Sequence, residues 1–312
     1  MKVLVIDSVH QDLLQGLRDL NFEIIEDYST SKEKLIPKLG EYNGLILRSR
    51  FPIDKDFLKA ASNLKFIGRV GAGMENIDIP FAKKMGIHLL SAPEGNRDAV
   101  AEHAIAMILM LFNNLKRADD EVRNGIWRRE ENRGLELSGK TIGIIGYGNN
   151  GSAFAKKLMG FGSEVLAYDK YKKGFSNNIV REVELDELKM KADILSLHIP
   201  QNPETINMLN QEFIDGFSKD FYLINTARGK IVNTKALIEA IEKGKILGAC
   251  LDVLEFEKSS FENMFDGEMP AEFQQLIKTE KVILSPHIAG WTQESKQKMA
   301  ATIIQKLKSI QF

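Results

Sequence analysis

Short apolar runs separated by stretches long enough to form a helix are the feature that most limits what this chain can fold into. Runs of 3 to 6 apolar residues are typical of strands that are buried on both faces of a sheet. Because strands that alternate with helices form βαβ units, the pattern predicts parallel sheets and a doubly wound α/β fold. The runs lie, in chain order, at residues 3–6, 45–47, 64–67, 87–90, 141–145, 165–168, 194–197, 222–224, 246–251 and 282–284.

One long apolar helix, predicted over residues 99–121, divides these runs into two groups, with four before it and six after it. The chain has 312 residues, which at roughly 150 residues per domain is enough for two domains. A last helix, predicted over residues 294–310, follows the final strand of the second group and can return to the first domain. We therefore expect two separate sheets, with the chain crossing between the two domains twice.

The charge balance and the single cysteine exclude several classes of protein. The 42 lysines and arginines nearly cancel the 43 aspartates and glutamates, so there is no global basic field for nucleic acid or an anionic membrane. Cys250 cannot form an internal disulfide, and the apolar start at residues 1–7 is too short for a signal peptide. The stretch 99–112 contains Glu102 and His103 and is shorter than the roughly 20 residues that span a bilayer. We expect a cytoplasmic protein that acts on small molecules.

Polar side chains follow most of the predicted strands at the point where each strand ends. The carboxyl ends of parallel strands meet at one edge of a sheet, and ligands bind in the crevice beyond that edge. The residues at these ends are therefore the first candidates for a site. They are Arg48, Arg69, Asp169, His198, Thr226, Arg228, Asp252 and His287.

The turn Gly-Tyr-Gly-Asn-Asn-Gly at residues 146–151 directly follows a predicted strand and opens a predicted helix. Gly146 permits a tight turn, Gly148 lets the backbone approach a pyrophosphate, and Gly151 lets the helix pack closely on the strand. Asp169 ends the next strand, where a carboxylate binds the ribose hydroxyls of an adenosine and repels a 2′-phosphate. The motif therefore predicts NAD rather than NADP as the cofactor. Three nearby basic residues weaken that preference: Lys170, Lys172 and Lys173.

None of the five histidines is spaced like a metal ligand, and we expect no metal site. His287 ends a strand within a rigid Ser-Pro-His turn and is the best candidate for chemistry. His198 is interpreted as a wall of the cleft, and His103 as a packing or interface residue. The remaining two, His10 and His88, are expected on the surface.

Arg228 follows an apolar strand in the sequence Asn-Thr-Ala-Arg-Gly, where a guanidinium is costly unless it faces a cleft or an anion. A substrate carboxylate meets this requirement, and so does a simple salt bridge to a nearby acid. Glu255 and Glu257 alternate along the chain and share a face. Their spacing therefore leaves open which of the two reaches a histidine.

Five motifs, taken in order along nearly the whole chain, resemble those of the D-isomer-specific 2-hydroxyacid dehydrogenases. They lie at residues 69–73, 146–151, 225–229, 248–252 and 285–287. The resemblance implies a flavodoxin-like substrate domain formed by residues 1–98 plus 286–312, with an inserted Rossmann domain for NAD at residues 99–285. It also implies a homodimer that the long helix helps to build.

Carried over by position, the resemblance assigns catalysis to Arg228, Glu257 and His287. His287 would exchange the proton of the substrate hydroxyl, while Glu257 would orient the ring and stabilise its imidazolium form. Arg228 would bind the substrate carboxylate and polarise the C2 oxygen. Proline usually follows the acid in this family, whereas this chain has Lys258. Formate dehydrogenases pair the histidine with glutamine and therefore fit less well.

The same resemblance assigns the remaining contacts to the cofactor and the substrate. Asp252 would bind the nicotinamide amide, and the backbone N–H groups of residues 71–73 would share the substrate carboxylate. The implied cofactor residues are Gly146, Gly148, Asn149, Asn150, Gly151, Asp169, Ile199, Pro200, Thr226, Ala227, Asp252 and Gly290. The implied substrate residues are Arg48, Ser49, Arg69, Gly71, Ala72, Gly73, Asn96 and Arg129.

Within the family, the resemblance is greatest to the D-3-phosphoglycerate dehydrogenases, which implies a phosphorylated 2-hydroxy or 2-oxo acid and a role in serine biosynthesis. Arg48, Arg69 and Arg129 would supply the fixed cations for a phosphate, the last of them from a partner subunit. Surface ion pairs are another explanation of the same arginines. Trp291 replaces the family's small or hydroxyl residue and would narrow the substrate pocket. A chain that ends at residue 312 would lack a regulatory serine-binding domain.

Two alternative functions stay open. A glyoxylate or hydroxypyruvate reductase on the same scaffold would not need three cations for a phosphate. A protein that only senses NAD, without turnover, would keep the glycine turn at residues 146–151 but would need no catalytic residues.

Overall fold

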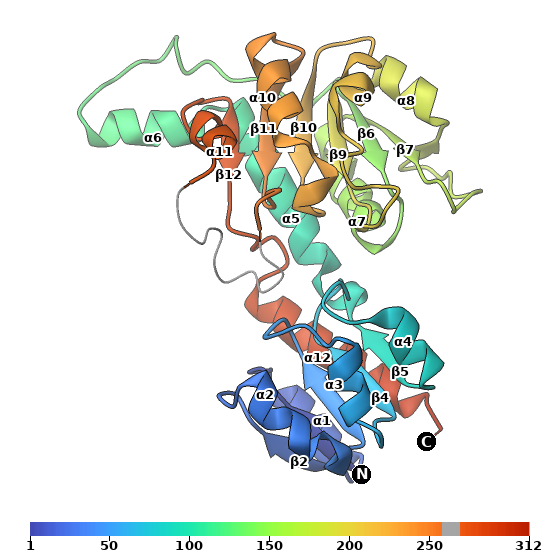
Figure 1. Ribbon diagram of the computed structural model, residues 1–312. Coiled ribbons are helices and arrows are strands. Elements are labelled where there is room, and N and C mark those ends of the chain that lie inside the picture. Colours follow the sequence, from blue (N-terminus) through green and yellow to red (C-terminus); the bar gives the residue numbers. More distant parts are fainter. Residues whose placement is uncertain (258–268, 312) are drawn as a thin grey trace. The chain divides into compact units, whose positions relative to one another are not determined.

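The computed structural model of the protein describes residues 1–257 and 269–311. These residues form two compact units, which Figure 1 shows. The first comprises residues 1–96 and 291–311, and the second comprises residues 97–257 and 269–290. Along the chain, the two units meet between residues 96 and 97 and between residues 290 and 291. The sequence-based division placed these domain boundaries between residues 98 and 99 and between residues 285 and 286.

The first unit is built on a five-stranded parallel sheet in the order β2-β1-β3-β4-β5. This is the flavodoxin-like order of a doubly wound fold, as expected. Helices α1 and α12 contribute buried side chains to one cluster, so the C-terminal helix completes the core of this unit. The strands are β1 (Lys2–Val5), β2 (Glu23–Glu26), β3 (Gly44–Leu47), β4 (Phe66–Arg69) and β5 (His88–Ser91), and the helices are α1 (Gln11–Asp19), α2 (Lys32–Leu35), the 3-10 helix Ile36–Glu41, α3 (Lys55–Ala60), α4 (Ile79–Lys84) and α12 (Gln293–Lys308).

The second unit is built on a seven-stranded parallel sheet in the order β12-β11-β10-β9-β6-β7-β8. This order extends the Rossmann arrangement, which confirms the predicted fold class. The strands are β6 (Thr141–Ile145), β7 (Glu164–Tyr168), β8 (Arg181–Glu182), β9 (Ile194–Leu197), β10 (Phe221–Asn225), β11 (Ile246–Leu251) and β12 (Val282–Leu284). The helices are α6 (Leu115–Arg123), α7 (Asn149–Lys157), α8 (Leu185–Lys191), α9 (Gln211–Asp215), α10 (Thr234–Glu242) and α11 (Ala271–Leu276), with 3-10 helices at Leu158–Phe161 and Gly229–Ile231.

Each sheet has one strand that the apolar runs did not reveal. β2 reads Glu-Ile-Ile-Glu, and β8 consists of only two charged residues. Both are edge strands, so they have one neighbour and exposed ends. An edge strand can keep polar residues that a central strand of a parallel sheet cannot, and this is why the hydrophobic pattern missed them.

The long apolar helix begins earlier and ends earlier than predicted. Helix α5 (Pro93–Phe112) stops before Asn114, whose left-handed φ of 51° separates it from α6. The sequence-based prediction merged the two helices because no glycine or proline marks the break. No helix in the described part of the chain has the length and apolar character needed to cross a bilayer.

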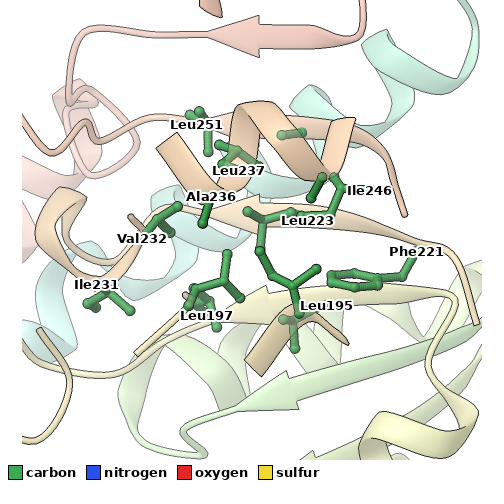
Figure 2. Packing of buried hydrophobic residues seen from close by; sticks show 14 of the residues in the cluster. Leu195, Leu197, Phe221, Leu223, Ile231, Val232, Ala236, Leu237, Ile246 and Leu251 are labelled. Atoms are coloured by element: carbon green, nitrogen blue, oxygen red, sulfur yellow. The ribbon is translucent and has the colours of Figure 1, made fainter. Parts of the chain in front are cut away.

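The central core of the second unit lies between β9, β10, β11 and the helix α10. Figure 2 shows Leu195, Leu223 and Leu237 meeting in this layer, and all three are at most 1% exposed. Such dense packing makes the sheet a rigid base. The loops at its carboxyl edge are therefore held in defined positions.

We predict that Ile303→Ala destabilises the first unit by about 2–5 kcal/mol, because this α12 side chain is fully buried in the cluster with α1. Gln305→Ala on the same helix removes an exposed side chain and should change stability by less than about 0.5 kcal/mol. Hydrogen exchange of the β1 and β3 amides measures the free energy of opening of the first unit in each of the two variants. Equal values for the two variants would contradict the proposed packing role.

Candidate active site

The strand order of the second unit changes direction next to β6. The chain runs from β6 outward to β7 and β8, and then returns to β9 on the other side of β6. Ligands of doubly wound folds bind beyond the carboxyl ends of the strands at such a point. The turn at residues 146–151 follows β6, and His198 follows β9, so both lie at this edge.

Two glycines of the turn occupy positions where a side chain would not fit. Gly146 has a φ of +93°, and a Cβ atom there would lie 2.5 Å from the carbonyl oxygen of His198. A Cβ atom at Gly151 would lie 2.0 Å from the carbonyl oxygen of Gly146. Glycine at these positions therefore lets the chain turn sharply and lets α7 approach β6 closely.

The N-terminus of α7 is open to an anion. Gly148 is its N-cap residue and makes no side-chain capping bond, and a Cβ atom at Gly148 would meet nothing within 4 Å. Asn149 and Asn150 form the first turn, and the Oδ1 atom of Asn150 is buried without a hydrogen-bond partner. Free N–H groups and the positive end of the helix dipole suit a pyrophosphate.

The Asp169 carboxylate follows β7 and is held by backbone donors. It accepts hydrogen bonds from the N–H groups of Tyr147 at 2.8 Å and of Tyr171 and Lys172 at 2.9 Å each. Partial burial acts to raise the pKa of Asp169, but these N–H groups and the Lys172 ammonium outweigh it and lower the pKa below its ordinary value. The carboxylate is therefore ionised at neutral pH, with lone pairs left to accept ribose hydroxyls.

The three lysines that follow Asp169 have partners of their own. Lys170 pairs with Glu204 at 2.7 Å, and Lys173 pairs with Glu184 at 3.0 Å. The Nζ atom of Lys172 donates to the Tyr147 carbonyl oxygen at 3.3 Å. The 2′-phosphate of NADP would have to compete with these partners for the lysines. The lysines therefore weaken the preference for NAD less than we expected from the sequence.

Two buried polar atoms without partners lie at the ends of the neighbouring strands β9 and β10. They are Nδ1 of His198 and Oγ1 of Thr226. Buried polar atoms are usually hydrogen-bonded, so unpaired ones indicate a ligand that completes them. Together with the turn and Asp169, these atoms fit NAD. The neighbouring Ile199 is partly exposed and Pro200 is exposed, whereas Ala227 is buried.

His198 cannot serve as the acid or base of a reaction at neutral pH. Burial of its ring lowers its pKa to about 3, and its Nε2 atom is hydrogen-bonded to Ser196 Oγ at 2.8 Å. A residue that transfers protons needs a pKa nearer to the working pH. His198 is therefore neutral at that pH, and its place in the wall of a cleft stays a prediction.

His287 and Glu257 form a direct pair in the second unit. The Nδ1 atom of His287 lies 2.7 Å from Glu257 Oε2, and both side chains are mostly buried, with 25% and 16% exposed. The other carboxylate oxygen of Glu257 accepts the backbone N–H of Leu254. Glu255 instead accepts the N–H of Thr234 at 2.8 Å. The structure thus decides which of the two acids reaches the histidine, a choice that the sequence spacing left open.

Asp252 follows β11 and is 1% exposed. Its carboxylate accepts hydrogen bonds from Ser285 Oγ at 2.6 Å and from the N–H groups of Ile288 and Ala289 at 2.9 Å each. Its carbonyl oxygen accepts the His287 N–H at 2.7 Å. Asp252 therefore holds the loop that carries His287, a contact that the sequence-based assignment to the cofactor did not foresee.

Arg228 follows β10 and is half-buried. Its Nη1 atom donates to the Ala227 carbonyl oxygen at 2.6 Å, and its own carbonyl oxygen accepts Asn225 Nδ2 at 3.0 Å. These contacts hold the backbone and one end of the guanidinium. The arginine therefore lies at the same edge of the seven-stranded sheet as His287, which follows β12, at the far end of the strand order.

In the first unit, Arg48 and Arg69 follow the paired strands β3 and β4. The backbone N–H of Arg48 donates to Asp7 Oδ2 at 2.6 Å, and its guanidinium carbon lies 4.0 Å from the centre of a Trp291 ring. The Arg69 guanidinium folds so closely over the next loop that a Cβ atom at Gly71 would lie 1.5 Å from its Nη1 atom. Both arginines are therefore held by their surroundings.

The other expected substrate residues divide between the units. Ser49, Ala72 and Gly73 are partly exposed in the loops after β3 and β4, and Asn96 has a buried Oδ1 atom without a partner. Arg129 belongs to the second unit and is exposed, so it does not lie in one unit with Arg48 and Arg69. The remaining cofactor residue, Gly290, is partly exposed, and Lys258 lies outside the described residues.

Three residues that contact the site loops, Arg50, Ser285 and Asp7, were not among the expected site residues. Arg50 donates to the carbonyl oxygens of Asp27 at 2.7 Å and Thr30 at 2.6 Å, so it stabilises the loop that carries Arg48. Arg50 lies in the loop after β3, which ends at Leu47, and this place in a strand-end loop was the signal that could have revealed it.

Within residues 1–257 and 269–311, no group of three or more metal-ligating side chains is present.

The sequence and the fold are similar to those of several known proteins. The family D-isomer specific 2-hydroxyacid dehydrogenase, NAD binding domain, matches residues 105–289. The chain is 35% identical over 309 residues to a D-3-phosphoglycerate dehydrogenase of Archaeoglobus fulgidus, with 98% of this chain and 56% of the relative covered. It is 37% identical over 292 residues to a glyoxylate reductase of Thermofilum pendens, with 91% and 83% covered.

A solved structure with the same fold is a D-lactate dehydrogenase of Aquifex aeolicus complexed with NAD and lactic acid. It superposes with a TM-score of 0.82 at 31% identity, covering 99% of this chain and 95% of that one. The chain spans about half the length of the curated phosphoglycerate dehydrogenases that it matches.

We predict that Asp169→Ala weakens NADH binding about 10- to 100-fold and lets NADPH bind comparably, because hydrogen bonds to a charged group are lost and a repulsive charge is removed. Asp193→Ala is the matched control. That carboxylate also accepts a backbone N–H, from Thr141 at 2.8 Å, but it precedes β9 at the opposite end of the strands. Fluorescence titration with both dinucleotides measures the effect, and equal losses in the two variants would exclude a ribose contact.

Proposed function

The chain belongs to the D-isomer specific 2-hydroxyacid dehydrogenase family, and we propose that it transfers a hydride between a D-2-hydroxy acid and NAD. The observation that carries this proposal is the 2.7 Å pair of His287 and Glu257 on the unit that holds the glycine turn. This pair provides a proton-transfer group next to the cofactor edge of the sheet.

In this proposal His287 exchanges the proton of the substrate hydroxyl through Nε2. Its Nδ1 atom is hydrogen-bonded to Glu257, so we assign the proton transfer to the other ring nitrogen. Bound NAD supplies the acceptor for the hydride that leaves C2. When the C2–H bond breaks, the hydroxyl proton passes to Nε2 and the C2–O bond becomes a carbonyl. The Glu257 carboxylate stabilises the imidazolium that results.

We assign the substrate carboxylate to Arg228, which follows β10. A guanidinium binds a carboxylate with two parallel hydrogen bonds and stabilises negative charge on the C2 oxygen. The nicotinamide amide is assigned to Asp252, whose Oδ2 atom accepts a single backbone N–H and keeps a lone pair for a second donor. Thr226 and His198, with their unpaired polar atoms, complete the cofactor contacts.

A protein that senses NAD without turnover would need no histidine–carboxylate pair. His287 occupies a left-handed φ of 55°, which is uncommon for a residue with a side chain. Such backbone strain occurs at functional sites because the surrounding structure enforces it. Both features favour an enzyme.

We predict that His287→Asn lowers turnover roughly 10²- to 10⁴-fold, because the group that exchanges the hydroxyl proton is lost. NADH binding should change less than about threefold, since no cofactor contact is assigned to this side chain. His88→Asn, at an exposed histidine of the first unit, is the matched control. Steady-state NADH formation and NADH titration measure the two effects. Unchanged turnover in His287→Asn would overturn the proposed mechanism.

For the substrate, we propose D-3-phosphoglycerate, oxidised to 3-phosphohydroxypyruvate in serine biosynthesis. The support is the guanidinium of Arg48, stacked at 4.0 Å on Trp291, together with the pairing of Leu47, the residue before Arg48, with Arg69 in the sheet. A stacked guanidinium is already oriented, so it loses little freedom when it binds a phosphate. The same stack gives Trp291 a function: it orients Arg48 rather than merely narrowing a pocket.

A glyoxylate or hydroxypyruvate reductase is the second candidate. The glyoxylate reductase of Thermofilum pendens is covered over 83% of its length, whereas the phosphoglycerate dehydrogenases are covered over 54–56%. The 37% identity to that glyoxylate reductase supports the reductase, and the stacked Arg48 supports the phosphorylated substrate.

The proposed macromolecular partner is a second copy of the chain. Exposed apolar side chains lie on α6 and the segment after it: Leu115, Val122 and Trp127 are 52%, 53% and 76% exposed. A homodimer would cover them.

We predict that the wild-type protein oxidises D-3-phosphoglycerate with a far lower KM than D-glycerate or D-lactate. Arg48→Ala should raise the KM for phosphoglycerate about 10- to 100-fold and leave that for glycerate nearly unchanged, because only the phosphate loses its partner. Arg18→Ala, at an exposed arginine of α1, is the control for a general charge effect. Turnover of glycerate without turnover of phosphoglycerate would assign the protein to the reductases.

A further inference from the structure

Asp252 carries a negative charge that is almost completely buried, and a histidine from a distant helix is among the groups that stabilise it. Burying a carboxylate is costly unless donors surround it. Three of these donors belong to residues 285–289. The fourth group is His103 of α5, whose Nε2 atom lies 3.6 Å from Asp252 Oδ1 and 2.8 Å from Ser285 Oγ.

The directions of these hydrogen bonds follow from the chemistry of the groups. An ionised carboxylate only accepts, so the Ser285 hydroxyl donates its one proton to Asp252 at 2.6 Å. The Met107 sulfur, 3.7 Å from the same hydroxyl, is a weaker and more distant acceptor. The hydroxyl oxygen then accepts from His103, which must carry its proton on Nε2.

These bonds form a chain from His103 through Ser285 to Asp252, and Asp252 holds the backbone of His287 and of the two residues after it. The His287 N–H donates to the Asp252 carbonyl oxygen at 2.7 Å, and the next two N–H groups donate to the Asp252 carboxylate. His287 also has its uncommon left-handed φ in this loop. A conformation of this kind persists only where several contacts enforce it.

We infer that His103 is a positioning residue for His287: its Nε2–H orients the Ser285 hydroxyl, and through Asp252 it fixes the 285–289 loop. This inference goes beyond the assignment of His103 as a packing or interface residue. The effect of His103 on turnover rests on the proposed function, in which His287 exchanges the substrate proton. The effect of His103 on the position of the His287 ring is independent of that function.

The first test removes the donor while keeping a side chain of similar size. His103→Phe should lower kcat roughly 10- to 100-fold, because misplacing a reacting group by about 1 Å costs about that much. His103→Gln keeps an N–H donor and should restore kcat to within about threefold of the wild type.

Met107→Leu is the matched control. Met107 is on the same helix, is 3% exposed and contacts the same Ser285 hydroxyl, but it supplies no donor. A loss of kcat in Met107→Leu as large as in His103→Phe, or no rescue by His103→Gln, would overturn the inference and leave His103 with a packing role only.

A second measurement does not depend on turnover. In protein with ¹⁵N-labelled histidine, the His103 ring should be protonated at Nε2, and the ring resonances of His287 should shift in His103→Phe. Ser285→Ala removes the middle of the chain and should produce the same shift, which also serves if His103→Phe does not fold. Met107→Leu should leave His287 unchanged.

The two measurements separate the two hypotheses. If the wild type turns over no 2-hydroxy acid but His287 still shifts in both chain variants, the proposed function fails and the positioning role stands. If the wild type is active and neither kcat nor the His287 resonances respond to His103→Phe and Ser285→Ala, the positioning role fails alone.

Discussion

The buried carboxylate of Asp252 is the constraint on which the arrangement around His287 depends. A charge that is 1% exposed must be surrounded by donors, and the donors that the fold brings to it come from one loop and from α5. Because the loop must satisfy the charge, its backbone has little freedom. Glu257 then needs only to orient a ring whose attachment point is already set.

The two sheets present different chemistry at their carboxyl edges. In the seven-stranded sheet, backbone N–H groups at the glycine turn and unpaired atoms of His198 and Thr226 suit a dinucleotide. In the five-stranded sheet, guanidinium groups follow two adjacent strands. Parallel strands make this possible, since every strand ends at the same edge and adds one loop there.

Much of the site could be predicted from the sequence, because its signals are local. A strand, a glycine turn and a helix are neighbours in the chain, so the order of residues at 146–151 is enough to indicate a cofactor loop. The edge strands β2 and β8 escaped because their polar residues lack the buried pattern. His103 escaped because a histidine in an apolar helix looks like a packing residue until its distant partner is placed beside it.

The sequence by itself determined the fold class, the position of the glycine turn and the family, since apolar periodicity and short motifs are properties of neighbouring residues. Only the tertiary structure decided that Glu257 rather than Glu255 reaches His287, and that Ser285 connects His103 to Asp252. These choices depend on how far each strand extends before its loop turns. That length is set by packing between residues far apart in the chain, and no local pattern records it.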